Sequence, residues 1–77
     1  MSEKTLAERI VIDPEIRFGK PRIKGTRVTV GDLLRALGAG DTMDELVEDV
    51  PDITREDILA ALAYAGENID RLVVASQ

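Results

Sequence analysis

The sequence contains no cysteine and no histidine, and these two absences exclude most familiar catalytic sites. Without them there is no disulfide framework, no thiol nucleophile, no imidazole base and no zinc site built from Cys and His. Carboxylates are the metal ligands that remain, but no supporting groups gather around a pair such as Asp49 and Asp52. We therefore expect no enzyme activity, no metal and no cofactor.

Long apolar segments are also missing. No apolar run approaches the roughly 18–20 residues of a membrane-spanning helix. The N-terminus, MSEKTLAERIVI, lacks the basic and then apolar order of a secretory signal. We expect a cytoplasmic protein without membrane contact. A chain of 77 residues forms one domain with a small core, so we also expect a partner protein or an oligomer such as a dimer.

Basic residues are concentrated in one part of an otherwise acidic chain. Residues 9–27 carry six basic and two acidic residues (net +4), whereas residues 28–77 carry three and eleven (net −8). A polyanion such as DNA should therefore meet the basic segment. The alternative is that these cations only keep an exposed strand edge from pairing with other chains. The candidate DNA-binding residues are Arg17, Lys20, Arg22, Lys24 and Arg27.

The basic segment is predicted to form a β arm over residues 9–28. Residues 9–12 contain three β-branched residues and end at an Asp-Pro turn signal, which indicates a short strand. Residues 21–23 and 26–28 are short extended runs, and Gly25 between them supplies a positive φ for a tight turn. We expect a hairpin here, with the first strand pairing beside it.

Two apolar residues lie in the loop that precedes this hairpin. Ile16 and Phe18, the only Phe of the chain, are predicted to anchor the loop to the helices. An aromatic side chain in such a place is more often part of a core than a platform for a ligand. Residues 1–8 are predicted to be a loose N-terminus.

Three capping boxes follow the arm at regular spacing. Each places a Thr hydroxyl where it accepts from the backbone N–H three residues on, and an acid where it accepts from the Thr N–H. An acid also suits the positive end of a helix. The three pairs are Thr29 with Asp32, Thr42 with Glu45 and Thr54 with Asp57.

These starts, together with a Gly-Ala-Gly stop after Leu37 and a proline at position 51, predict helices over residues 30–37, 43–50 and 55–65. Their apolar positions form one stripe on each helix. The predicted core residues are Leu33, Leu34, Leu37, Met43, Leu46, Val47, Val50, Ile58, Leu59, Leu62 and Ala65. Residues 29–65 thus make a three-helix unit with the plan of helix-turn-helix proteins.

The last segment, residues 66–77, allows two structures. The apolar spacing of the third helix continues across Gly66, which predicts one helix to about Val74, some 30 Å long. The alternative is that Gly66 ends the helix and the remainder is a tail. A long helix would extend past the core and need a partner. The candidate partner-binding residues are Ile69, Leu72 and Val73.

Acidic residues on the second and third helices argue against ordinary major-groove reading. A recognition helix presents Arg, Lys, Asn or Gln to the bases, and carboxylates in that place repel the phosphates. The acids expected to be exposed on the second helix are Asp44, Glu45, Glu48 and Asp49.

From Ile10 to about Gly66 the sequence resembles a small prokaryotic family, domain of unknown function 433. The resemblance lies in GKPRIKGTRVTV, DLLRALGAG, TMDELVEDVPDIT and REDILAALAYAGE. It implies a β-hairpin followed by a homeodomain-like helical unit. It also implies an antitoxin that neutralises a PIN-like ribonuclease toxin and regulates its own operon by binding DNA. The family's pattern often has two glycines where this chain has Phe18 and Gly19.

The sequence therefore predicts a mostly α, small α+β protein: a short β-hairpin, a three-helix homeodomain-like unit and an extended C-terminal helix. The expected function is that of an antitoxin-like regulator that binds a toxin protein, its own copy, or both, and also DNA. The alternative is a protein-interaction adaptor without a DNA role, whose acidic helices dock a basic partner.

Overall fold

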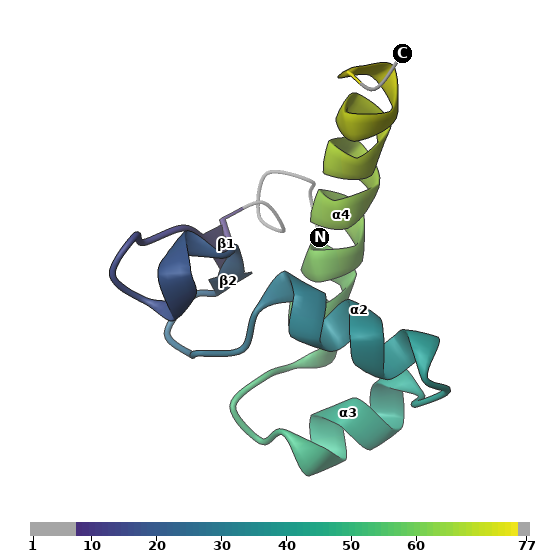
Figure 1. The fold of residues 1–77 in the computed structure, drawn as a ribbon. Coiled ribbons are helices and arrows are strands. Elements are labelled where there is room, and N and C mark those ends of the chain that lie inside the picture. The colour runs from purple at the N-terminus through teal and green to yellow at the C-terminus, as the bar shows by residue number, and fades with distance from the viewer. Residues whose placement is uncertain (1–7, 76–77) are drawn as a thin grey trace.

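The described part of the chain folds into a small two-stranded sheet, a 3-10 turn and three α-helices (Figure 1). The computed structural model describes residues 8–75, with side chains described as far as Ile69. In chain order the elements are β1 (Ile10–Val11), the 3-10 turn η1 (Arg17–Gly19), β2 (Arg22–Ile23), α2 (Val30–Gly38), α3 (Met43–Asp49) and α4 (Arg55–Ala75). The predicted mostly α, small α+β class is confirmed. All but the last residue of the predicted loose N-terminus lies outside the described residues.

The sheet is formed by β1 and β2, which pair antiparallel with Ile10 opposite Ile23. The predicted turn after β2 is present, because Gly25 has a φ of +81° and the Thr26 N–H donates to the Ile23 carbonyl at 3.0 Å. The chain beyond this turn, residues 26–28, forms no strand. It contributes the Val28 carbonyl, which accepts from Ile23 at 2.8 Å, and leads to a single bridge between positions 22 and 29.

All three predicted capping boxes are present, and the helices begin at the predicted residues. In each box the Thr hydroxyl accepts from the backbone of the acid, and the acid accepts from the Thr N–H, at distances of 2.8 to 3.3 Å. A cap joins residues only three apart, so these starts depend on local chemistry.

α2 ends at the predicted glycine-rich turn. Gly40 takes the left-handed conformation with a φ of +108°, whereas Gly38 is the last helical residue. The Gly40 N–H donates to the Leu37 carbonyl at 3.0 Å, and the Asp41 N–H donates to the Ala36 carbonyl at 3.1 Å. These are the two bonds of a Schellman motif, which satisfies carbonyls at the helix end and turns the chain toward α3.

The core lies between β2 and the inner faces of the three helices. Ile58, near the start of α4, is fully buried. The buried apolar cluster consists of Ile23, Val30, Leu33, Leu46, Ile53, Ile58 and Ala61, and the half-buried residues packed on it include Leu34, Leu37, Met43, Val47, Val50 and Ala65. Nine of the eleven predicted core residues therefore belong to the core or pack against it.

Two predicted core residues, Leu59 and Leu62, lie on the surface. They are 42% and 37% exposed, whereas Ala60 and Ala61 are buried. Leucine is more hydrophobic than alanine, so the sequence favours Leu59 and Leu62 as core residues. In the structure α4 packs on the core through its small residues, which let the helix lie close to the core. The prediction was wrong at these two positions.

The predicted anchoring of Phe18 is also wrong, because its side chain is 94% exposed. Arg17 and Phe18 both have positive φ, 50° and 60°. In this turn the side chain of Arg17 contacts α2 through Asp32, while Phe18 is left in solvent. Ile16 is half-buried.

α4 continues through Gly66 to Ala75, which confirms the extended helix. Its 21 residues correspond to about 30 Å, and Ala65 is the last described residue of α4 that packs on the core cluster. The C-terminal half of α4 rises away from the other elements (Figure 1). Ile69 in this half is 57% exposed.

The capping bonds lead to a stability prediction. Thr54→Ala should lower the free energy of unfolding by about 1 kcal/mol, because the N–H of Asp57 loses its side-chain acceptor and keeps only the Thr54 carbonyl. Thr29→Ala and Thr42→Ala should act in the same way, and Thr54→Ser, which keeps a hydroxyl, is the control. Urea unfolding followed by circular dichroism measures the change. Wild-type midpoints for all three Ala variants would refute the capping roles.

The continuous helix leads to a second prediction. A Cβ added at Gly66 meets no atom within 4 Å, so Gly66→Ala should stabilise the protein by roughly 0.5–1 kcal/mol through helix propensity. Gly40→Ala, also open in space but with a φ of +108°, is the matched control and should destabilise. Thermal unfolding distinguishes the two. A destabilised Gly66→Ala variant would argue that α4 does not run straight through this position.

Candidate functional site

The basic arm, residues 9–28, is fastened to α2 through Asp32. Arg17 donates from Nη1 to Asp32 Oδ2 at 3.1 Å and to the Arg27 carbonyl at 2.8 Å. Asp32 also accepts from the Thr29 N–H and from Arg35 Nη2. Burial opposes ionisation of Asp32, but the bonds from Thr29 and Arg17 outweigh it and lower the pKa of this carboxyl. Arg17 therefore holds the arm in place.

Arg22 also serves the fold. Only 9% of this residue is exposed, and its Nη1 donates to the Thr26 carbonyl at 2.9 Å, which braces the turn around Gly25. Its Nε is buried and has no hydrogen-bond partner among the described residues. A buried guanidinium cannot reach a phosphate without disrupting the turn, so Arg22 is a poor candidate for direct contact with DNA.

The other three predicted DNA-binding residues, Lys20, Lys24 and Arg27, are exposed. None of them forms an ion pair with another residue in the described part of the chain. They remain available to an anionic ligand. The structure thus divides the five predicted residues into two that brace the arm and three that face solvent.

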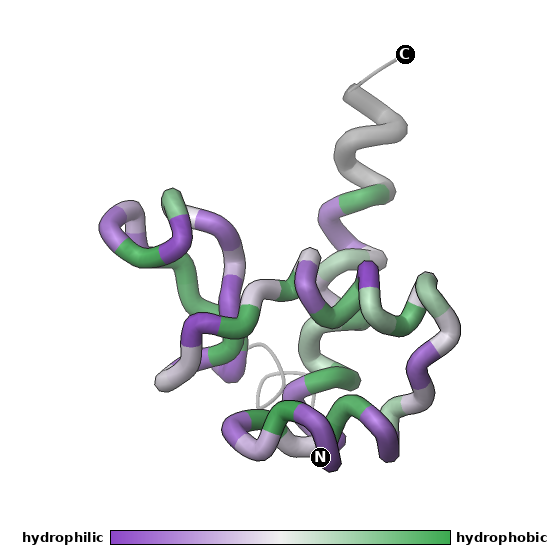
Figure 2. The backbone as a smooth tube through the Cα atoms, turned by 60° about the horizontal axis from the view of Figure 1, so that its bottom comes forward, coloured by the Kyte–Doolittle hydropathy of each residue, from purple (hydrophilic) through white to green (hydrophobic). Residues whose placement is uncertain are grey.

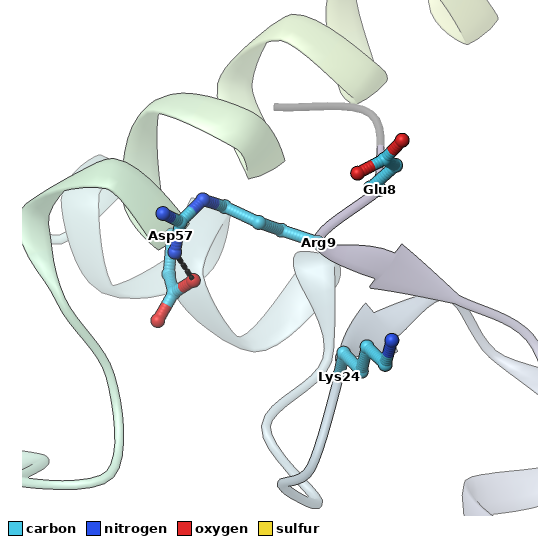
Figure 3. A pocket seen from close by; sticks show the side chains of 4 residues that line it. All are labelled: Glu8, Arg9, Lys24 and Asp57. Carbon is cyan, nitrogen blue, oxygen red and sulfur yellow. Dashed lines mark hydrogen bonds and ion pairs between the residues drawn. The ribbon is translucent and has the colours of Figure 1, made fainter. Parts of the chain in front are cut away.

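A shallow hollow of about 330 Å³ lies where the arm meets α4 and is lined by Glu8, Arg9, Lys24 and Asp57 (Figure 3). Arg9 Nη1 donates to Asp57 Oδ1 at 2.9 Å, across 48 residues of sequence. Asp57 is also the acid of the α4 cap, so the start of β1 is tied to the start of α4. Sequence reasoning found the cap but missed this pair, because no local pattern relates the two positions.

One face of α4 exposes an apolar stripe, which we call the α4 stripe: Leu59, Leu62 and Ile69. At 100° per residue the three lie within about 80° of one another around the helix. Exposed Gly66 lies between them on this face, and exposed Ala63 lies on the other side of Leu59. Of the predicted partner-binding residues, Ile69 belongs to this stripe, and the side chains of Leu72 and Val73 lie outside the described part. The stripe leaves α4 with an apolar face that the described chain does not cover.

The acids of α3 are exposed as expected. Asp44, Glu45, Glu48 and Asp49 all face solvent, and Asp44 accepts from Arg55 Nη1 at 2.7 Å. The backbone bond from Thr42 lowers the pKa of Glu45. This helix presents a negative surface, unlike that of a recognition helix.

The described residues contain no group of three or more acidic side chains placed to hold a metal ion. Over the same residues, no helix has the length and apolar character needed to cross a membrane. Apolar and polar positions instead alternate along the chain (Figure 2).

Comparisons with known proteins bear on this arrangement. The chain is 34% identical over 61 residues to the uncharacterized protein y4eO of Sinorhizobium fredii (strain NBRC 101917 / NGR234), an alignment that covers 79% of this chain and 28% of that protein. This chain thus spans less than a third of that relative. The crystal structure of a DUF433 member protein from Anabaena variabilis ATCC 29413, at 2.00 Å resolution, is 31% identical, with a TM-score of 0.78 over 96% of this chain and 74% of that one. The family model for proteins of unknown function DUF433 matches residues 10–65, from β1 into α4, and the chain therefore belongs to the DUF433 family.

Proposed function

We propose that this chain is an antitoxin-like regulatory protein whose α4 stripe binds a PIN-like ribonuclease toxin. The supporting observation is the exposure of Leu59, Leu62 and Ile69 on a helix that extends past the core. The partner is the one implied by the resemblance of the sequence to antitoxins. A second copy of the chain is the alternative occupant of the same face.

Burial of the stripe would favour binding. Complete burial of an aliphatic side chain contributes about 1.5–3 kcal/mol, and each of these three is about half exposed, so each would add on the order of 1 kcal/mol. The side chains follow a spacing of three and then seven residues, which is typical of a helix that lies in a groove of a partner. A groove with apolar walls would match the stripe.

We further propose that the arm binds DNA through Lys20, Lys24 and Arg27. These cations are exposed, and Glu15 is the one exposed acid within the arm, whereas α3 exposes four acids. The contacts would be made to phosphates and would provide affinity rather than sequence reading. The competing function is an adaptor without a DNA role, which the negative surface of α3 favours, since that surface would attract a basic protein partner.

Charged substitutions in the stripe test the partner contact. Leu62→Glu combined with Ile69→Glu should abolish copurification with the product of the neighbouring reading frame, because two carboxylates would be desolvated at the interface. Ala39→Glu, an exposed position on the far end of α2, is the control for added charge. Circular dichroism checks folding.

The mass of the complex, measured by sedimentation, separates the occupants of the stripe. A dimer of this chain that the double variant disrupts would assign the stripe to self-association. A toxin that still copurifies with the double variant would contradict the proposal and favour the acidic surface of α3.

Charge reversal in the arm tests the DNA contact. Replacing Lys20, Lys24 and Arg27 with Glu should abolish the gel shift of DNA from upstream of the protein's own reading frame. For wild type, affinity should fall with salt, and neutralising these three residues with Gln should reduce the salt slope by about 3. Arg55→Glu, a reversal on α4, is the control. The absence of any shift at low salt, with or without the partner, would leave only the adaptor function.

A further inference from the structure

Phe18 lies in a turn whose backbone is strained. Arg17, Phe18 and Gly19 are three consecutive residues with positive φ, at 50°, 60° and 76°. Glycine adopts this conformation readily, but a bulky side chain rarely does. Strain of this kind persists only where surrounding interactions fix it, and it is concentrated at sites that bind.

Hydrogen bonds hold this turn in its conformation. The Gly19 N–H donates to the Ile16 carbonyl at 3.1 Å, and the Lys20 N–H donates to the Arg17 carbonyl at 3.2 Å. The side chain of Arg17 reaches Asp32 at the start of α2. These bonds fix the backbone conformation of the turn, and in this conformation the ring of Phe18 lies in solvent.

The chain around the ring carries charges of both signs. Asp13 and exposed Glu15 precede the turn, and the cations are Arg17, Lys20 and Arg27. Lys20, two residues on, is exposed and has no ion pair in the described part of the chain, and the same holds for Arg27. The Arg27 carbonyl accepts from Arg17, so its backbone lies against the same turn. Arg17 and Arg35 share the single carboxylate of Asp32, which leaves that group with a net positive charge.

A ligand that contacts both the exposed ring of Phe18 and the cations Lys20 and Arg27 must offer a flat apolar face with anionic groups beside it. A nucleobase between phosphates does so, and aromatic side chains flanked by cations stack on bases in this way. An acidic protein surface would match the cations, but it would also need an apolar or aromatic side chain beside its acids to pack on the ring.

We propose that Phe18 stacks on a DNA base, with Lys20 and Arg27 contacting the adjacent phosphates. The proposal rests on the DNA-binding part of the function above. The base is either one step of a duplex, which the ring enters as a wedge, or an unpaired base on which the ring lies.

Phe18→Trp provides a direct probe, because the chain contains no other tryptophan. Its emission should be quenched when the protein is titrated, at low salt, with a 20-base-pair duplex from upstream of its own reading frame or with either single strand of it. Ala39→Trp, at an exposed position after α2, is the matched control and should not be quenched. Quenching by the duplex supports a wedge, and quenching by the single strand alone supports stacking on an unpaired base.

Phe18→Ala tests the contribution to affinity. It should weaken binding about 5- to 150-fold, the range for loss of one stacked base, while the salt slope stays unchanged. Lys20→Gln with Arg27→Gln should instead reduce the slope by about 2. Because Phe18 is exposed, its variants should unfold as wild type does.

These experiments distinguish stacking by Phe18 from DNA binding by the arm. DNA binding that persists at full strength in Phe18→Ala, with no quenching in Phe18→Trp, would overturn the stacking role and leave the DNA contact intact. A wild-type protein that binds neither duplex nor single strand at low salt would overturn both.

Discussion

Two carboxylates that cap helices also hold the basic arm on the helical body. Asp32 closes the cap of α2 and accepts from Arg17, and Asp57 closes the cap of α4 and accepts from Arg9. The groups that fix where these helices begin thus also fix where the arm lies. Glu45, the acid of the α3 cap, receives no arginine within the described part of the chain, and α3 is the helix without a link of this kind to the arm.

The pair at α4 is the more constrained of the two. Only 9% of the Asp57 side chain is exposed, against 34% for Asp32, and a buried carboxylate that loses its cation is strongly destabilising. The strands it helps to position have two residues each, too few to form a stable sheet alone. In a small chain without disulfides, this ion pair and the packing of Ile23 keep the sheet on α4.

The features that the sequence predicts well are the ones decided within a few residues. Each capping box involves positions three apart, so the local sequence is enough to predict the helix starts. The same holds for the turn at Gly25. The inner face of α4 is decided by the fit between helices, which is why exposed Leu59 was assigned to the core in place of Ala61. The exposure of Phe18 differs from the prediction for a related reason. Arg17 and Phe18 adopt a positive φ, and neither residue type signals that conformation in a sequence.

The arm contains more basic residues than it can offer to a ligand. Five basic residues were candidates, but Arg17 and Arg22 donate to groups of the chain itself, which leaves Lys20, Lys24 and Arg27. The remaining cations lie on the arm, and Lys24 among them lines the hollow beside the start of α4. Ile69, at the end of the α4 stripe, follows the last described residue of α4 that packs on the core. Under the proposed function, a partner on α4 and DNA on the arm would therefore occupy different parts of the molecule. Binding of the partner then need not displace DNA. The ion pair of Arg9 with Asp57 is one direct link between the two parts, because it joins the arm to the first turn of α4.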